Sequence, residues 1–255
     1  MIAFVLLLCA GMPAGAELVR QGDLIVAFDG GLRPKELPRT HAVPVAVRVG
    51  GDIRDAGGNQ ARLPQLRTIA VAINRAGRLY DRGLPSCEVH SIQPATEREA
   101  RRVCGPAIVG TGHVTLQVRL PPQEPFAVRA RLLAFNGPRE GPRKLILAQV
   151  YAEDPPGAFV LTFKVSRGKG LFGTVLRTAL PPEARNWAYL THFDLTLNRT
   201  YSHRGRARSY ISAACAAPAG FSGAVFPFAR ATYGFDDGRT LKVTAVRSCR
   251  VRGGS

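Results

Sequence analysis

Two residues in one segment have the types and the spacing for chemistry. His192 and Asp194 stand two positions apart in a β-like run, so on a strand their side chains point to the same face. His203 follows shortly after and could return to the same place through a turn. Such a cluster can bind a metal ion or act as an acid–base pair. A polar strand face whose histidine is partnered or solvated explains the same residues, and we favour this simpler interpretation.

The densest basic segment runs from Tyr201 to Tyr210. Arg204, Arg206 and Arg208 alternate there, and in an extended chain Tyr210 shares their face. Guanidinium groups suit phosphate or carboxylate, and basic residues beside aromatic ones also suit single-stranded nucleic acid. A solvated loop is the alternative. We predict an anion-binding surface, with no specific nucleic acid as partner, made of Arg204, Arg206, Arg208 and Tyr210.

Other segments match catalytic motifs but lack the structural context that those motifs need. The segment from Gly168 to Gly173 fits G-x-G-x-x-G, but a dinucleotide site needs a helix next, and the following run is β-like. Ser166 and Lys169 fit S-x-x-K without the companion motifs of that chemistry. The surroundings of Ser222 miss the G-x-S-x-G elbow. The sequence therefore predicts no catalytic residue, no metal and no cofactor.

The cysteines predict disulfides. Cys9 lies in the apolar N-terminal run, and four others remain. The sequence has no C-x-x-C, and no histidine stands at ligand spacing from a cysteine, which disfavours a metal site. Four cysteines allow three pairings. We expect Cys87–Cys104 and Cys215–Cys249, because each pair flanks one locally continuous unit, and an even count suits an exported chain.

The N-terminus predicts export. Ile2–Ala10 is almost purely apolar, and Ala14 and Ala16 supply the small residues of an A-x-A cleavage site. The run is shorter than the roughly 20 apolar residues that span a bilayer, although no basic residue precedes it. We predict a signal peptide over residues 1–16. Residues 17–255 would form a secreted or cell-envelope domain without a transmembrane segment.

The net charge of the chain indicates which class of partner it favours. The chain carries a formal net charge of +17, and its 35 basic residues include only five lysines, which leaves 30 arginines. A GC-rich genome explains arginine over lysine but not the excess of bases over acids. Basic charge favours anionic partners and says nothing about the fold. The apolar content of 45% is that of a globular chain.

Alternating apolar residues predict strands. The clearest runs are 43–49, 69–73, 114–120, 159–165 and 241–245, each with one buried and one wet face. Turn signals separate strands at Asn136-Gly137-Pro138, Pro155-Pro156-Gly157 and Asp236-Asp237-Gly238. We predict an all-β fold, a large antiparallel sandwich-like domain with one short helix.

The helix is predicted from its ends. Thr96 and Glu99 form a capping-box pattern, Arg101 and Arg102 suit the end of a helix dipole, and Gly105 supplies a stop. Cys104 would tie the end of this helix to Cys87.

A sub-boundary is conceivable near residues 121–125. The segment 24–30 echoes 131–137, as a duplication would leave it. The Pro-rich residues 121–125 also suit a plain hairpin loop, which we favour because both flanking runs alternate up to it.

Several segments carry a resemblance: Gly83–Cys87, Leu145–Tyr151, Pro218–Phe221, Phe226–Ala231 and Arg247–Cys249. They resemble a group of uncharacterised exported, disulfide-containing, β-rich proteins from high-GC bacteria, over most of the mature chain. The resemblance implies export and paired cysteines, and no activity comes with it.

These observations favour a binding or structural protein outside the cytoplasm. Its basic surface would contact an anionic envelope polymer or lipid headgroups. The alternative is a secreted hydrolase or a metal-dependent enzyme that uses His192 and Asp194. The two differ in whether polar side chains converge in a cleft, and the sequence alone does not decide whether the chain is an enzyme.

Overall fold

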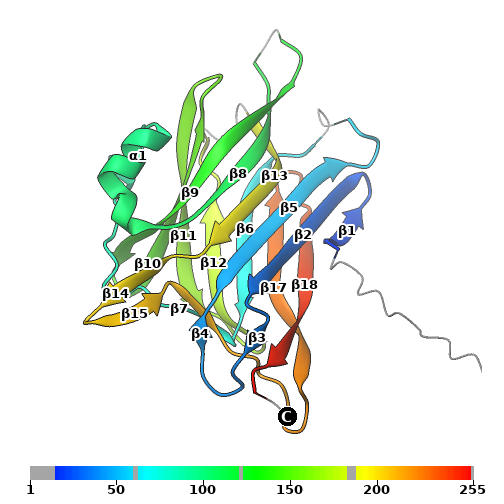
Figure 1. Cartoon of the computed structure of the whole chain (residues 1–255). Coiled ribbons are helices and arrows are strands. Elements are labelled where there is room, and N and C mark those ends of the chain that lie inside the picture. The colour runs from blue at the N-terminus through cyan, green and yellow to red at the C-terminus, as the bar shows by residue number, and fades with distance from the viewer. Residues whose placement is uncertain (1–14, 60–62, 121–122, 183–187, 254–255) are drawn as a thin grey trace, which may run out of the picture.

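Strands dominate the computed structural model, which describes residues 15–59, 63–120, 123–182 and 188–253 (Figure 1). Within these residues, thirteen strands form one large sheet and five more form two small sheets. Neighbouring strands of the large sheet run antiparallel except for one short parallel pair at its end. The predicted all-β class is confirmed. The predicted signal peptide lies almost entirely in residues 1–14, outside the described residues.

The large sheet follows an order that differs from the chain order. In sheet order its strands are β1 (Glu17–Gln21), β2 (Leu24–Arg33), β5 (Ala46–Asp55), β13 (Ala188–Leu197), β8 (Ile108–Val118), β9 (Phe126–Glu140), β10 (Arg143–Ala152), β11 (Gly157–Arg167), β12 (Phe172–Ala179), β6 (Leu66–Asn74), β17 (Gly223–Phe235), β18 (Thr240–Val251) and β3 (Glu36–Leu37). The small sheets are β4 (Val43–Pro44), β16 (Ile211–Ala213) and β7 (Gly77–Leu79), and β14 (Thr200–His203) with β15 (Arg206–Ser209).

The large sheet curls until its first strands meet its last ones (Figure 1). β18 lies against β1 and β2, and side chains close this seam. Arg247 of β18 pairs with Glu17 of β1 at 2.6 Å and with Asp29 of β2. Its Nε also donates to the carbonyl oxygen of Gly30. The Arg247 side chain is only 10% exposed, whereas Glu17 and Asp29 are 29% and 41% exposed, so water screens these charged hydrogen bonds only in part.

Replacing Arg247 with methionine should lower the free energy of unfolding by about 2 kcal/mol, because the seam loses several hydrogen bonds to charged groups. Urea denaturation would measure the change. The matched control is Arg250→Met, an exposed arginine on the same strand. Equal stability losses in the two variants would contradict the importance of the Arg247 contacts.

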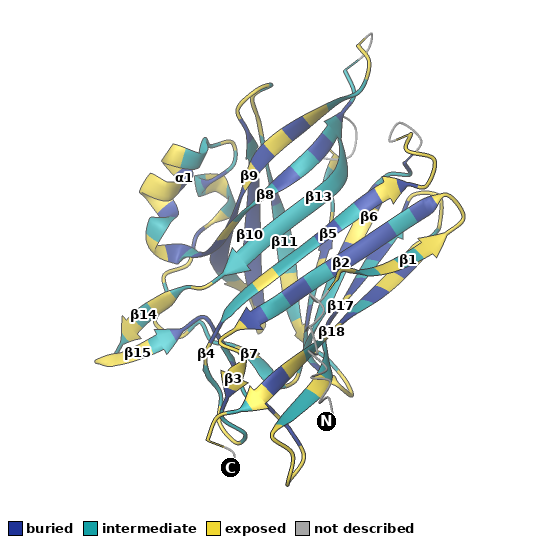
Figure 2. Cartoon of the chain, turned by 45° about the vertical axis from the view of Figure 1, so that its right-hand side comes forward, coloured by how far each residue is buried: buried dark blue, intermediate teal, exposed yellow. Residues whose placement is uncertain are grey.

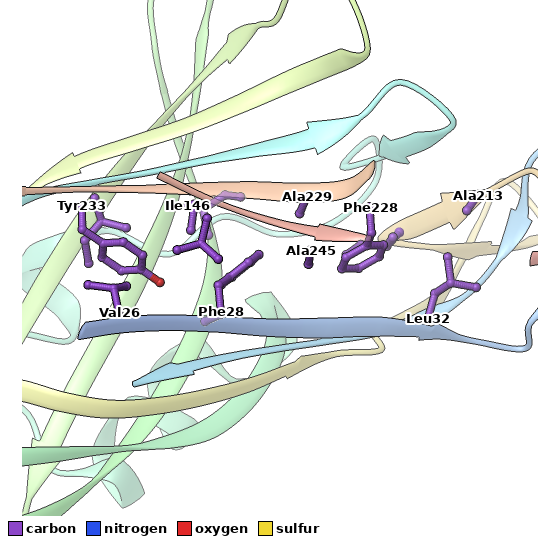
Figure 3. Close-up of a cluster of buried hydrophobic side chains, with 14 of the residues drawn as sticks. Val26, Phe28, Leu32, Ile146, Ala213, Phe228, Ala229, Tyr233 and Ala245 are labelled. Carbon is purple, nitrogen blue, oxygen red and sulfur yellow. The ribbon is translucent and has the colours of Figure 1, made fainter. Parts of the chain in front are cut away.

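One part of the interior is packed tightly, between β2 and the strands β17 and β18. Val26 and Phe28 of β2 are fully buried and face Tyr233 and Phe228 of β17 and Ala245 of β18 (Figure 3). Their alternation along the strands puts every second side chain into this layer. This layer of facing strands is the sandwich-like part of the fold.

The rest of the interior is hollow. The sheet encloses an apolar cavity of about 200 Å³ whose wall comes from the ten consecutive strands β2 to β17 in sheet order. The described residues of β13 are of intermediate burial along its whole length, whereas β2 is mostly buried (Figure 2). At about 24 cal/mol per Å³, an empty space of this size costs about 5 kcal/mol.

The three-stranded sheet borders one end of this cavity. It lies at the lower end of the molecule in Figure 1, and Leu79 of β7 and Ile211 and Ala213 of β16 contribute to the cavity wall. Pro44 occupies the edge strand β4 of this sheet, where the missing N–H is tolerated. Pro227 lies at a register shift between β17 and β18. Both prolines therefore occupy the edge or bulge positions that such residues favour.

The predicted helix and both predicted disulfides are confirmed. α1 (Glu97–Cys104) begins at Thr96, and the capping box with Glu99 is complete. Cys104 is bonded to Cys87, and Cys215 is bonded to Cys249. The helix covers the outer face of β9 and β10, where Leu133, Phe135 and Leu147 join one cluster with Ala100 and Cys104.

One predicted turn is wrong. Asn136-Gly137-Pro138 does not end a strand, because β9 continues to Glu140 and the chain turns at Gly141, whose φ is 60°. Tertiary contacts hold Asn136 in the strand: its side chain donates to the carbonyl oxygen of Pro85, and its own carbonyl oxygen accepts from the N–H of Cys87.

The other turn signals fall between paired strands. Pro155–Gly157 joins β10 to β11, and Asp236–Gly238 joins β17 to β18. The glycine-rich segment 168–171 joins β11 to β12, so a hairpin turn, rather than a dinucleotide loop, accounts for it. β8 and β9 pair on either side of residues 121–125, of which residues 121 and 122 lie outside the described residues.

Candidate anion-binding site

A two-residue hairpin presents the arginines of the predicted basic segment. β14 and β15 pair antiparallel, with His203 opposite Arg206 and Tyr201 opposite Arg208. Arg204 and Gly205 form the turn, and both have positive φ, 52° and 70°. This matches the turn type that suits the twist of a hairpin.

Arg204 occupies a left-handed position that favours glycine, asparagine or aspartate. Among the described non-glycine residues, it is the one recorded with a positive φ. An arginine there costs about 1 kcal/mol relative to a residue suited to this conformation. The turn therefore places the Arg204 side chain at the tip of the hairpin at a small cost in stability.

The hairpin forms one wall of a pocket of about 470 Å³. The opposite wall follows directly after β7 and consists of Tyr80 and Arg82. The Tyr201 hydroxyl lies 3.0 Å from the carbonyl oxygen of Arg82 and 3.3 Å from that of Tyr80, so it holds the two walls together. The described lining residues contain no carboxylate: they are Tyr80, Arg82, His203, Arg204, Arg206 and Arg208. We call this the basic pocket.

Arg208 is the best-positioned cation in the basic pocket. Its guanidinium lies over the ring of Tyr80, 5.4 Å from the centroid, which fixes its plane through a cation–π contact. Its Nε is buried and has no hydrogen-bond partner among the described residues. A buried donor without a partner is unfavourable, and the remaining N–H groups of the Arg208 guanidinium are the ones that would meet an anion in the pocket.

A glycine makes room for His203. A side chain at Gly83, which has a φ of 85°, would collide with the His203 ring. The ring therefore packs directly on the backbone of the segment that carries Tyr80 and Arg82.

The carboxylate next to the basic pocket, that of Asp81, already pairs with two cations. Asp81 pairs with Arg139 at 2.9 Å and with Lys144 at 3.7 Å. Lys144 is nearly buried and lies over the ring of Tyr210, 4.5 Å from the centroid. Desolvation lowers the pKa of Lys144 to about 8, although Asp81 opposes the shift. Asp81 is therefore engaged by two cations beside the arginines of the pocket.

One residue of the predicted surface is wrongly placed. Tyr210 is fully buried in the main core cluster, with the Lys144 ammonium over its ring, and it does not line the basic pocket. Burial raises the pKa of its hydroxyl. Arg204, Arg206 and Arg208 do come together, and Tyr80 and Arg82 join them from a distant part of the chain. No periodic pattern in the sequence marks those two residues as part of a site.

His192 and Asp194 form cross-strand pairs on the outer face of β13. The His192 Nδ1 lies 2.8 Å from the carboxylate of Asp52 on β5. Asp194 lies 3.8 Å from His113 on β8, whose other ring nitrogen is 2.6 Å from Arg131 on β9. Polar side chains that pair directly across antiparallel strands stabilise a sheet, so these contacts account for the two residues without catalysis.

The predicted cluster of His192, Asp194 and His203 does not form. His203 lies in the basic pocket, whereas the other two lie on β13. The described residues contain no group of three or more histidine, cysteine, aspartate or glutamate side chains placed to hold a metal ion.

Comparison with family models, curated proteins and solved structures found no match. Among the described residues, no helix is both long enough and apolar enough to cross a membrane.

Proposed function

We propose that this chain is a binding protein that works outside the cytoplasm and uses the basic pocket to hold phosphate or carboxylate groups of an anionic envelope component. The observation that carries this proposal is the convergence of Arg82, Arg204, Arg206 and Arg208 in one concave site. Arginine suits bidentate contacts to these anions, and the Tyr80 ring holds the Arg208 guanidinium in place for such a contact.

The proposed compartment rests on the disulfides and the N-terminal segment. Two disulfides are typical of oxidising compartments, and the apolar run with its A-x-A site supports export. The net charge of +17 would draw the protein toward anionic surfaces, and the basic pocket would then give local contacts.

Replacing Arg204, Arg206 and Arg208 together with serine should weaken binding to immobilised polyphosphate by about tenfold or more. Exposed ion pairs give at most about 1 kcal/mol each, so the affinity must come from several contacts made together. A polyglutamate matrix would show whether carboxylate serves as well as phosphate. Retention on both should fall with salt, which screens exposed charges beyond about 8 Å.

The control for bulk charge is the triple variant Arg129→Ser, Arg143→Ser and Arg167→Ser, which removes three exposed arginines elsewhere. Equal losses in the two triple variants would overturn the basic pocket as the site. Arg204→Asn sharpens the comparison, because asparagine tolerates positive φ. This variant should be at least as stable as the natural protein while binding polyphosphate less well.

A further inference from the structure

The structure assigns a second binding site, distinct from the basic pocket: we infer that the cavity inside the curled sheet binds the unbranched hydrocarbon chain of an amphiphile with an acidic headgroup. This inference goes beyond the proposed function, which concerns the outer surface. It rests on the chemistry of the cavity wall, on the shape of the cavity and on the position of its one charged residue.

The wall of the cavity is apolar except at one place. Among the described lining residues, only Asn74 and Arg78 have polar side chains. The Asn74 amide already donates to the carbonyl oxygen of Pro227 and accepts from the N–H of Ala76. A space lined in this way does not hold ordered water, which needs two or more polar partners. The natural occupant is therefore hydrocarbon.

The inward side chains of β13 show that protein atoms do not fill this space. Phe193, Leu195 and Leu197 point into the cavity but remain only partly buried. On β2, Val26 and Phe28 are fully buried where β17 and β18 pack against them. Apolar residues inside a sheet keep accessible surface only where nothing packs on them, and burying that surface is the driving force for an apolar ligand.

The cavity is long and narrow. Its wall follows β13 from Ala188 to Leu197, about 30 Å of strand at about 3.4 Å per residue, yet its volume is only about 200 Å³. A helix of another protein is about 10 Å across and does not fit in such a space. A single unbranched chain suits a space of this length and volume.

The charged residue lies at one end of the cavity. Arg78 is exposed and belongs to β7, in the small sheet that borders the lower end. Its guanidinium makes no hydrogen bond or ion pair to the other residues that the structure describes. Because Leu79 points into the cavity, the Arg78 side chain leaves β7 on the opposite face, so it would pair with an acidic headgroup at the rim while the chain fills the cavity.

Calorimetric titration with octanoic, decanoic, dodecanoic and tetradecanoic acids tests the inference on the unaltered protein. Affinity should rise roughly fourfold per methylene, because each buried methylene contributes a constant transfer free energy. It should stop rising when the chain fills the cavity. Absence of binding by all four acids, or affinity that does not depend on chain length, would overturn the inference.

Bulky substitutions in the wall locate the bound chain. Leu195→Trp and Leu161→Trp place indole rings in the cavity from β13 and β11. Each should weaken dodecanoic acid binding by about tenfold or more by filling the space. The controls Thr196→Trp and Thr162→Trp alter the neighbouring, outward positions of the same strands. If the wall variants fold, as circular dichroism would show, and bind as tightly as their controls, the cavity is not the site.

A separate variant tests the contact between Arg78 and the headgroup. It introduces no tryptophan, so it does not depend on whether the tryptophan variants fold. Arg78→Gln should weaken dodecanoic acid binding by about fivefold, the value of one exposed ion pair, and leave dodecanol binding unchanged. Equal effects on acid and alcohol would refute the contact with Arg78. Lyso-phosphatidylglycerol with the same chain distinguishes the sources: tighter binding than the free acid identifies a lipid, and weaker binding a fatty acid.

The triple serine variant of the basic pocket separates the two proposals. It should bind dodecanoic acid as the natural protein does while losing polyphosphate binding. If it loses binding of both the acid and polyphosphate, the basic pocket binds the headgroup, the cavity inference fails and the proposed function stands.

Discussion

Replacing Cys215 and Cys249 together with alanine should lower the free energy of unfolding by about 4 kcal/mol. This disulfide closes a loop of 34 residues, and the loss of loop entropy in the unfolded chain grows with loop length. Both cysteines are buried in the main core cluster, so the bond joins the segment after β16 to β18 in the tightly packed part of the interior. Urea denaturation of the oxidised protein and of the variant would measure the difference.

The second disulfide supplies the comparison. Cys87–Cys104 closes 17 residues, for which the same relation gives about 3 kcal/mol. It lies on the outer face with α1, so Cys87→Ala with Cys104→Ala should release the helix first. Hydrogen exchange would then quicken at the amide of Ala100 in α1 and not in β17. Equal quickening in both elements would show that the helix and the sheet unfold as one unit.

The free energy of unfolding should rise by about 2 kcal/mol between pH 8 and pH 10. The folded-state pKa of Lys144 is about 8 against 10.5 in the unfolded chain. In this window the unfolded chain holds a proton that the folded chain has lost, so stability increases with pH. A shift of one pKa unit corresponds to about 1.4 kcal/mol. Below pH 8 the charged ammonium is buried and its desolvation penalty is present in full.

Lys144→Met should remove this rise. The variant keeps the Asp81–Arg139 pair and is expected to be more stable than the natural protein at pH 7, with the difference shrinking toward pH 10. Lys164→Met, which alters an exposed lysine on the neighbouring strand, is the control and should leave the slope unchanged. A slope that survives in Lys144→Met would contradict the assignment. Above pH 10 the buried hydroxyls of Tyr210 and Tyr233, whose pKa values burial raises, reverse the trend.

Local signals in the sequence predicted the elements well. The capping box at Thr96 follows from a short-range rule, and among the three possible pairings of four cysteines the preference for neighbours in the chain selected the two that form. The turn predicted at Asn136-Gly137-Pro138 failed because contacts with Pro85 and Cys87, some 50 positions away, hold Asn136 in β9. Tertiary contacts thus overrode a local preference, as they often do in sheets.

Only part of each candidate site could be predicted from the sequence. The alternating arginines in the sequence predicted one wall of the basic pocket. Tyr80 and Arg82 form the other wall because β7 pairs with β16, and no pattern in the sequence predicts this pairing. The partners of His192 and Asp194 depend on the register of β13 with β5 and β8. The cavity could not be predicted from the sequence. Alternation shows which side chains point inward, but it does not show whether side chains from facing strands touch one another.

The seam between β18 and the first two strands has a consequence for how the chain folds. Glu17 and Arg247 are 230 positions apart, so the sheet cannot close until nearly the whole chain has been synthesised. The Cys87–Cys104 disulfide can form before that point, whereas Cys215–Cys249 cannot, because Cys249 lies on β18 itself. Until β18 arrives, the apolar inner faces of β5, β13 and β8 stay open to solvent, and contacts this distant in sequence form slowly. The nascent protein therefore passes through a stage in which the side chains of its future interior are exposed to solvent. Aggregation competes with folding during that stage.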